Sequence, residues 1–264
     1  MRTARKYLAL YWAFFRASFT ADLEFRANFA MKIITDIFWY LSQIVSFELL
    51  YNFTDSIGDW NRAQTRIFLG VLFVVDAIYM VLFSQNLDLL SENVRKGGLD
   101  LLLSKPVSSQ FMISFQRAAT AILGNLLLGL AWLAFAIYSY EGFSWWRLGW
   151  LVITIPTGVA IFYTLRFLFA ATAVIFTRAE NLQYLFFNLY KLGMRPDNIY
   201  FAPLKYVVIT IIPVGLIASV PSRLILGSAS PWLALWGLAA AAICIWISHL
   251  FWNYALSKYT SASS

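Results

Sequence analysis

Four charged side chains stand inside long apolar stretches, where an ionised group is costly. Lys32 and Asp36 are four residues apart in "MKIITDIF", while Asp76 and Arg166 stand alone in "VLFVVDAIYMVLF" and "GVAIFYTLRFLFA". If these stretches span a membrane, such residues usually face the bundle interior, pair with one another, or mark a substrate or ion path. We expect Lys32 to pair with Asp36, and Asp76 with Arg166, as a structural pair or within a path. With two further polar residues of the first stretch, the candidates for a path or a dimer seam are Lys32, Asp36, Gln43, Glu48, Asp76 and Arg166.

A second group of charges surrounds a glycine pair in "ENVRKGGLDLLLSKP", residues 92–106. Gly97 and Gly98 are expected to end one helix, because glycine readily takes the left-handed conformation found at helix C-termini. Pro106 is expected to stop the short leucine-rich helix that follows. The resulting knob suits a groove on a soluble partner, where leucines supply burial and charges set register. The alternative is a loop that only turns the chain, but such a loop does not need two short helices around a glycine pair.

The patterns of common enzymatic sites are missing from the sequence. It has no G-x-x-x-x-G-K-[ST] loop, so it does not bind ATP through that device. The single cysteine, Cys244, excludes an internal disulfide framework and a multi-cysteine metal site. The single histidine, His249, is best interpreted as a packed or interfacial side chain. We therefore expect no catalytic residue, no metal and no cofactor bound by this chain.

The composition indicates a membrane protein. Of the 264 residues, 61% are hydrophobic and only 12% are charged, against about 25% charged residues in soluble domains. Much of the surface must therefore face something other than water. The net charge of +7 follows from basic loops, as membrane orientation predicts, and does not require nucleic acid as a partner.

Six apolar stretches are too long and too continuous for barrel strands and are expected to be transmembrane helices. They cover about residues 30–53, 67–84, 111–138, 148–176, 200–220 and 231–256. Lysine and arginine gather in the N-terminal segment and in the loops after the second and fourth stretches, which places these segments and both termini in the cytoplasm. The loop after the fourth stretch is expected to add partner contacts through Arg178, Glu180, Lys191 and Arg195.

The N-terminal segment predicts a helix over residues 5–26. Its apolar residues Leu8, Trp12, Phe15 and Phe19 recur at helical spacing. A helix with bulky aromatic and basic residues can lie in the membrane interface. The alternative is an overlong cytoplasmic start of the first transmembrane helix.

The stretch "VRKGGLDLLLSKPVSSQF", after two predicted spans and before four more, resembles the signature loop of bacterial type-2 ATP-binding-cassette permeases. These are six-span membrane subunits of the exporter type. The resemblance implies that this loop contacts a separate nucleotide-binding subunit and passes its closure to the membrane helices. The residues assigned to this ATPase-coupling loop are Val94, Arg95, Lys96, Gly97, Gly98, Leu99, Asp100, Leu102, Leu103, Lys105 and Pro106.

The same resemblance implies partners and further elements. ATP and Mg²⁺ are expected on the partner ATPase, beside a second permease subunit, identical or related, in the bacterial cytoplasmic membrane. Short re-entrant elements are implied between the fifth and sixth spans. The stretch "IIPVGLIASVPSRLILGSASPW" fits them, because Pro213, Pro221 and Pro231 interrupt an apolar run. From the residues alone, a proline-kinked helix end followed by a loop is an equal alternative.

The sequence therefore predicts an all-α membrane protein of one domain, residues 1–264. It has six transmembrane helices, an N-terminal interfacial helix and a cytoplasmic coupling helix after the second span. The function hypothesis is a permease subunit of an ATP-driven exporter, with hydrolysis in a separate subunit and the cargo left open. The alternative is a membrane scaffold that transports nothing and recruits a soluble partner through the same loop.

Overall fold

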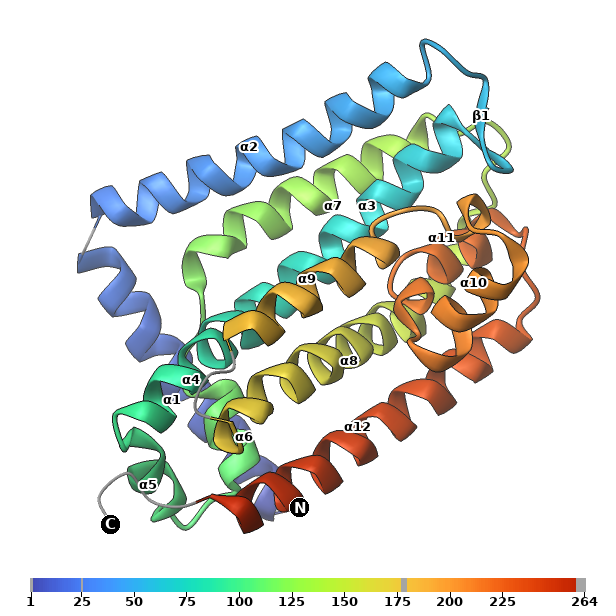
Figure 1. Ribbon diagram of the computed structural model, residues 1–264. Helices are drawn as coiled ribbons and strands as arrows, with labels where there is room; N and C mark the ends of the chain where they lie inside the picture. Colours follow the sequence, from blue (N-terminus) through green and yellow to red (C-terminus); the bar gives the residue numbers. More distant parts are fainter. Residues whose placement is uncertain (1, 25, 177–179, 260–264) are drawn as a thin grey trace.

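The computed structural model describes residues 2–24, 26–176 and 180–259, which form a bundle of helices with one small β-hairpin at one end (Figure 1). Five of the described helices are long and apolar enough to cross a membrane. They are α2 (Arg26–Leu50), the continuous helix of α3 (Arg62–Tyr79), η1 (Met80–Ser84) and α4 (Gln85–Arg95), α7 (Leu123–Tyr138), α8 (Gly149–Ala171) and α12 (Trp232–Lys258). The hairpin joins β1 (Ser56–Ile57) to β2 (Trp60–Asn61).

The fourth and sixth predicted spans agree closely with α8 and α12, and the first agrees with α2. The second span is longer than predicted, because the helix continues past residue 84 to Arg95. Its middle portion, η1, is a π-helix, in which one extra residue per turn is inserted without ending the helix. The segment that leads to the glycine pair is therefore a rigid extension of a membrane helix.

Helix α3 is the centre of the bundle and contacts α7, α8 and α11 (Ser219–Leu226). Its residues from Ile67 to Val75 are all buried. Small residues allow the neighbouring backbone to approach closely. A Cβ added to Gly70 would lie 2.7 Å from the Cα of Leu133, and one added to Gly129 would lie 3.2 Å from the Cβ of Phe73. The α3–α7 contact therefore depends on glycine on both sides.

The prediction of one unbroken third span over residues 111–138 is wrong. The structure has a short helix α6 (Ser109–Phe115), a turn, η2 (Thr120–Ile122) and then α7. Asn86 of α4 explains how the break is tolerated, because its amide satisfies the freed backbone groups. The Asn86 side chain accepts from the N–H of Arg117 at 2.8 Å and donates to the carbonyls of Ser114 and Arg117 at 3.1 and 2.7 Å.

The prediction of a fifth span over residues 200–220 is also wrong. This region forms short helices gathered near the hairpin (Figure 1). They are α10 (Ala202–Tyr206), η6 (Val207–Ile211), η7 (Val214–Leu216) and α11 (Ser219–Leu226). Pro213 stands at the break between η6 and η7, because proline cannot donate the backbone hydrogen bond that a continuous helix needs. This arrangement agrees with the short elements that the family resemblance implied.

A buried ion pair holds these short helices. Arg223 Nη2 donates to Asp197 Oδ2 at 2.6 Å, and the backbone N–H of Asp197 donates to the hydroxyl of Ser219 at 3.1 Å. Burial raises the pKa of the Asp197 carboxyl, and the guanidinium of Arg223 offsets part of this shift. The chain segment before α10 is thereby fastened to α11.

Helix α9 (Glu180–Gly193) lies in the bundle, beside α8 and α3 (Figure 1). The sequence predicted a cytoplasmic loop here. Instead, Phe186 and Tyr190 are buried, and the ring of Tyr190 stacks on Phe162 of α8 at 4.3 Å. Beyond α9 the chain reaches the hairpin, where Asn198 Nδ2 donates to Asp59 Oδ2 at 3.0 Å. The face of α9 with Phe186 and Tyr190 thus packs against protein, whereas Tyr184 and Phe187 are exposed.

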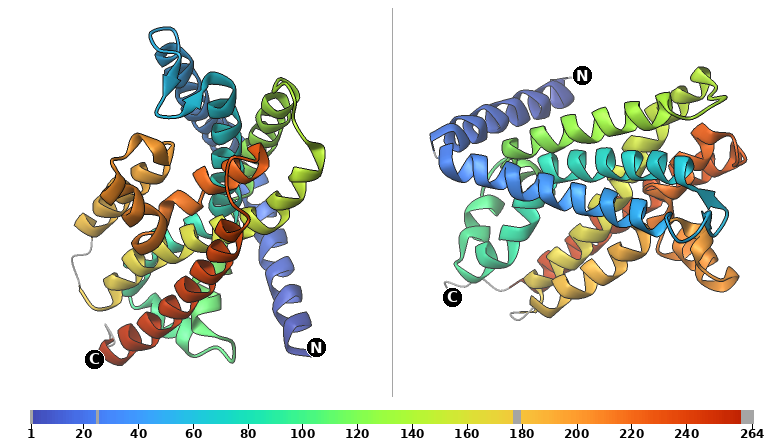
Figure 2. Two further views of the ribbon diagram at one scale, coloured as in Figure 1. Left: turned by 90° about the vertical axis from the view of Figure 1, so that its right-hand side faces the viewer. Right: turned by 90° about the horizontal axis from the view of Figure 1, so that it is seen from above.

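Helix α1 (Arg2–Glu24) crosses the end of the bundle at a steep angle to α2 (Figures 1 and 2). The start of α1, the end of α12 and α5 (Gly98–Leu103) all lie at this end, opposite the hairpin. One face of α1 binds the segment that follows α5. The hydroxyl of Tyr7 accepts from the N–H of Ser108 at 3.2 Å, and Thr120 Oγ1 donates to Asp22 Oδ2 at 2.6 Å.

The other face of α1 carries the apolar stripe predicted from the sequence. Leu8, Trp12 and Phe19 are exposed by 70%, 52% and 41% of their surface. A helix that binds protein with one face and exposes leucine and aromatic residues on the other has the form of an interfacial membrane helix. The independent helix was predicted correctly, and it is not an extension of the first span, because α1 and α2 run in different directions.

Candidate functional site

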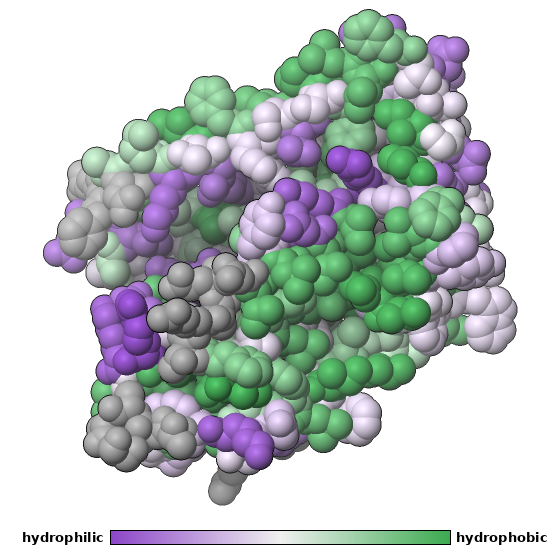
Figure 3. Space-filling view, in the orientation of Figure 1, coloured by the Kyte–Doolittle hydropathy of each residue, from purple (hydrophilic) through white to green (hydrophobic). Residues whose placement is uncertain are grey.

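A cavity of about 860 Å³ lies between α2, α3 and α9. In the space-filling view it is a recess below α2, where hydrophilic residues gather within a largely hydrophobic surface (Figure 3). Its polar lining includes Asp36, Gln43, Asp76, Asn125, Arg166 and Lys191. Residues from five helices, distant in sequence, therefore converge on one space.

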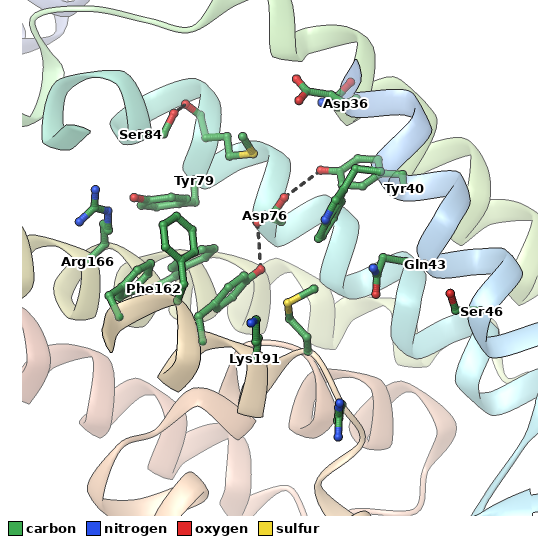
Figure 4. A pocket seen from close by; sticks show the side chains of 18 of the residues that line it. Asp36, Tyr40, Gln43, Ser46, Asp76, Tyr79, Ser84, Phe162, Arg166 and Lys191 are labelled. Carbon is green, nitrogen blue, oxygen red and sulfur yellow. Dashed lines mark hydrogen bonds between the residues drawn. The ribbon is translucent and has the colours of Figure 1, made fainter. Parts of the chain in front are cut away.

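Asp76 of α3 stands at the centre of this cavity and is only 6% exposed (Figure 4). Two tyrosines on opposite walls bind its carboxylate. Tyr40 of α2 donates to Oδ2 at 3.0 Å, and Tyr190 of α9 donates to Oδ1 at 2.9 Å. The carboxylate thus joins three helices through its two oxygens.

The predicted ion pair between Asp76 and Arg166 is wrong. Arg166 of α8 is 2% exposed and donates from Nη2 to Asp88 Oδ1 of α4 at 2.5 Å. Its guanidinium also lies 5.2 Å from the ring centre of Phe186. Asp88 was not a candidate because the sequence placed it beyond the end of the second span, whereas the helix continues through it.

Aromatic rings form much of the cavity wall. Phe162 of α8 stacks on Tyr79 of α3 at 3.9 Å and on Tyr190 of α9 at 4.3 Å. On the α2 side, Tyr40 stacks on Phe73 at 4.4 Å. The cavity thus combines flat apolar surfaces with a buried carboxylate.

Two buried polar groups at the cavity have no hydrogen-bond partner within the described chain. Asn125 of α7 is completely buried, yet neither its amide nitrogen nor its amide oxygen is bonded. Arg166 Nη1 is likewise unbonded, although Nη2 is paired. Buried polar groups in proteins are almost always bonded, so these two call for a ligand or a water.

A short helix occupies the position predicted for the coupling helix. Helix α4 ends at Arg95, Gly97 takes a left-handed φ of 73°, and α5 follows over six residues. Pro106 lies three residues beyond its end. Lys96 pairs with Glu92 at 2.5 Å on the surface. The local rules for glycine and proline therefore predicted this element correctly.

The leucines of α5 divide into a buried and an exposed set. Leu99 and Leu102 are almost fully buried against the bundle, whereas Leu101 is 70% exposed. Leu101 was absent from the predicted coupling residues. Because residues 99 and 102 occupy one face of a helix, their burial leaves residue 101 as the apolar side chain that can meet a partner.

The family described as "ABC-2 family transporter protein" matches residues 37–263 of this sequence. The chain belongs to this family. Comparisons with curated proteins and with solved structures gave no match. This ABC-2 protein is thus a multi-pass membrane transporter component of the permease type, as the coupling-loop motif had indicated.

The remaining predicted residues of this ABC-2 protein have separate positions. Among the ion pairs within the described ranges there is none between Lys32 and Asp36. Asp36 and Gln43 line the cavity. Glu48 instead accepts from Arg66 through both oxygens, at 2.5 and 2.9 Å, and so fastens α2 to the start of α3.

The residues predicted for a second cytoplasmic loop do not form one. Arg178 lies outside the described residues, and Glu180 begins α9. Lys191 and Arg195 are exposed residues that line the cavity, and both follow Tyr190 along the chain. The structure therefore separates them from α5, because α9 runs along the bundle toward the hairpin.

Sequence reasoning missed Tyr40, Tyr190, Asp88, Asn125 and Leu101. A partial signal existed for Tyr40, which is four residues after Asp36 and so shares its helix face. Asn125 also gave a partial signal, because it is a polar residue inside the apolar run of the predicted third span. Tyr190 gave none, because tyrosine is an ordinary residue in an aromatic-rich sequence. Their role follows only from the packing of α7, α8 and α9 around α3.

Proposed function

We propose that this ABC-2 protein is the membrane-spanning subunit of an ATP-driven exporter. Two permease subunits, identical or related, enclose the path, and separate ATPase subunits bind in the cytoplasm, at the end that carries α5, the start of α1 and the end of α12. The observation that carries the proposal is Leu101, an exposed leucine on a short helix fixed to the end of a membrane helix. Its surroundings match the family motif, and apolar burial is the usual driving force of such docking.

The path from α5 to the cavity is short and continuous. Helix α4 runs without interruption through the π-helix η1 into α3, which carries Asp76. π-Helical segments within α-helices frequently occur at functional sites. The Arg166–Asp88 pair joins α8 to the same α4. A movement of α5 caused by a closing ATPase would therefore be passed to Arg166 and to Asp76 at the cavity. The resulting change would be a rigid-body transition of the helices that nucleotide binding favours.

A second permease subunit accounts for the open side of the cavity. Helix α2 forms one wall but is mostly exposed, with Phe38, Val45 and Leu49 exposed by 68%, 52% and 54%. Lipid covers part of this surface in a membrane protein. Its polar residues Gln43 and Ser46 line the recess. Polar side chains in a membrane are more stable against protein than against lipid hydrocarbon, so a partner subunit is the better neighbour for them.

The test is ATP hydrolysis by the complex purified from its native membrane under mild extraction. Leu101→Glu is expected to lower co-purification of an ATPase subunit, and the associated hydrolysis, at least tenfold. The matched control is Phe53→Glu, the same kind of change at a residue 88% exposed near the hairpin, at the opposite end. It is expected to leave both quantities unchanged.

Three other outcomes would contradict the proposal in different ways. If no ATPase accompanies the wild-type protein, the exporter assignment fails. If Leu101→Glu behaves like Phe53→Glu, α5 is not the docking site. If an ATPase binds but no hydrolysis-dependent transport follows in vesicles, the scaffold alternative replaces the exporter.

A further inference from the structure

Asp76 is a buried carboxylate without a basic partner. None of the ion pairs found in the described part of the chain includes it. Among the described residues, its two oxygens accept only from the neutral hydroxyls of Tyr40 and Tyr190. A carboxylate at mid-membrane depth is costly and is a functional-site candidate by default. Two hydroxyl donors orient the carboxylate and leave its negative charge uncompensated.

The aromatic rings around Asp76 are a second feature that suits the binding of a cation. Tyr40 and Tyr190 hold the carboxylate, and Phe162 stacks on Tyr190 at 4.3 Å and on Tyr79 at 3.9 Å. Aromatic faces attract an organic cation through their quadrupole, and desolvated sites strengthen this attraction. The same faces accept apolar substituents, so the surface suits a cation that carries hydrophobic groups.

Asn125 and Arg166 give an independent indication that a ligand occupies this space. Asn125 is fully buried with both amide atoms unbonded, and Arg166 Nη1 is unbonded at 2% exposure. Both residues line the same cavity as Asp76. Ile122, three residues before Asn125, belongs to one buried cluster with Val81 and Ala77, the residue after Asp76. A ligand hydroxyl, amide or carbonyl would satisfy these groups.

The other charged groups of the cavity do not cancel Asp76. The guanidinium of Arg166 is neutralised by Asp88 at 2.5 Å. Lys191 and Arg195 line the same cavity but are exposed, and within the described part of the chain neither forms an ion pair with Asp76. Asp36, four residues before Tyr40 on α2, adds a second carboxylate to the lining. Within the described residues, the buried part of the cavity therefore holds one carboxylate without a basic partner, that of Asp76.

We propose that the cavity binds an amphiphilic organic cation, whose charged head lies at Asp76 between Tyr40 and Tyr190. Its apolar substituents lie on the Phe162 and Tyr79 rings, and a polar group lies toward Asn125. This inference rests on the proposed export function, since it names the substrate class of the same path. Asp76 is the residue that sets charge selectivity.

The experiment compares two probes of the same shape and opposite charge. Radiolabelled tetraphenylphosphonium and tetraphenylborate are equilibrated with the permease–ATPase complex in lipid nanodiscs, and binding to empty nanodiscs is subtracted. The wild type is expected to bind the phosphonium saturably and at least tenfold more tightly than the borate. Equal binding of the two ions would show a cavity that is only apolar, which would overturn the proposal.

Variants locate the site. Asp76→Asn keeps the shape and is expected to weaken phosphonium binding at least tenfold, and Asp76→Glu to restore part of it. Tyr190→Phe keeps the ring and removes one hydroxyl, so a smaller loss of about threefold is expected. Asp55→Asn, the same neutralisation at an exposed residue near the hairpin, is the control and should bind as the wild type does.

The outcomes separate this inference from the proposed function. If the complex hydrolyses ATP but Asp76→Asn binds the phosphonium as the wild type does, the cation site is refuted while the exporter assignment stands. If Asp76→Asn does not fold, Tyr190→Phe and Asp76→Glu decide: unchanged affinity in both would refute the site. If no ATPase accompanies the chain, the proposed function fails, whatever the probes show.

Discussion

At the scale of single residues, Arg166 shows how a buried charge is kept in a membrane helix. Its side chain is 2% exposed, whereas that of its partner Asp88 is 58% exposed. Removing Asp88 leaves a buried guanidinium without its counter-ion. Leaving a buried donor without its partner costs about 1–3 kcal/mol, and the exposure of Asp88 keeps the loss below that of a fully buried ion pair.

Asp88→Ala is therefore expected to lower the thermal unfolding midpoint clearly, as followed by tryptophan fluorescence in detergent. Asp88→Asn keeps an acceptor oxygen for Arg166, so its loss is expected to be smaller. Glu92→Ala, which removes an exposed partner of Lys96 four residues away, is the control and is expected to leave the midpoint unchanged. Equal midpoints for Asp88→Ala and Glu92→Ala would mean that the Arg166 pair does not support the fold.

The sequence identified Asp76 and Arg166 as important but could not assign their partners. A charged residue in an apolar run is visible in the sequence without any structure, because charged residues are rare in membrane spans. Which residue pairs with such a charge depends on how the neighbouring helices are aligned and how deep each lies in the membrane. The sequence of a single apolar run does not give this information. Asp88 lay in an expected loop, and the two tyrosines that bind Asp76 come from helices 36 and 114 residues away in sequence.

At the scale of elements, the α3–α7 contact depends on the absence of a side chain at Gly70. A Cβ there would lie 2.7 Å from the backbone of Leu133, so the two helices would have to separate. Overpacking of this kind costs about 1–3 kcal/mol. Gly70→Ala is expected to lower the unfolding midpoint by an amount that corresponds to this range.

Gly149→Ala is the matched control for that substitution. Gly149 begins α8 and has no heavy atom within 4 Å of an added Cβ. Alanine stabilises a helix relative to glycine by up to about 1 kcal/mol. This variant is expected to be neutral or slightly more stable, and a Gly70→Ala protein as stable as Gly149→Ala would contradict the packing argument.

The elements that local rules govern were predicted well, and those that packing governs were not. Helix α5 follows from the left-handed Gly97 and from Pro106, both within a few residues of its ends. The break before α7 depends on Asn86, about 30 residues earlier. The aromatic residues of α9 are compatible with a helix on the membrane surface and with a helix packed against α8. Only the tertiary fold shows that Phe186 and Tyr190 pack against protein.

At the scale of the whole molecule, the surface of this ABC-2 protein is asymmetric. Helix α2 stands on one side with the polar recess beneath it, and α12 lies on the opposite side of the bundle (Figure 1). Both helices expose large apolar residues. Only the α2 side combines them with a cavity that contains charges, which is the arrangement expected where two permease subunits face each other across a path.

A photoreactive label tests which side meets the second subunit. In a Cys244→Ala background, Ser46→Cys on α2 places a thiol at the cavity, and Trp246→Cys places one on α12, where Trp246 is 62% exposed. Each is labelled with benzophenone maleimide in native membranes and irradiated. Ser46→Cys is expected to give a product with the mass of two permease subunits, because benzophenone reacts with an identical or a related neighbour. Trp246→Cys is expected to remain at the mass of one subunit, since lipid covers α12. The reverse pattern would move the interface to α12 and would leave the recess open to lipid, where its unpaired carboxylate and amide could not be retained at low cost.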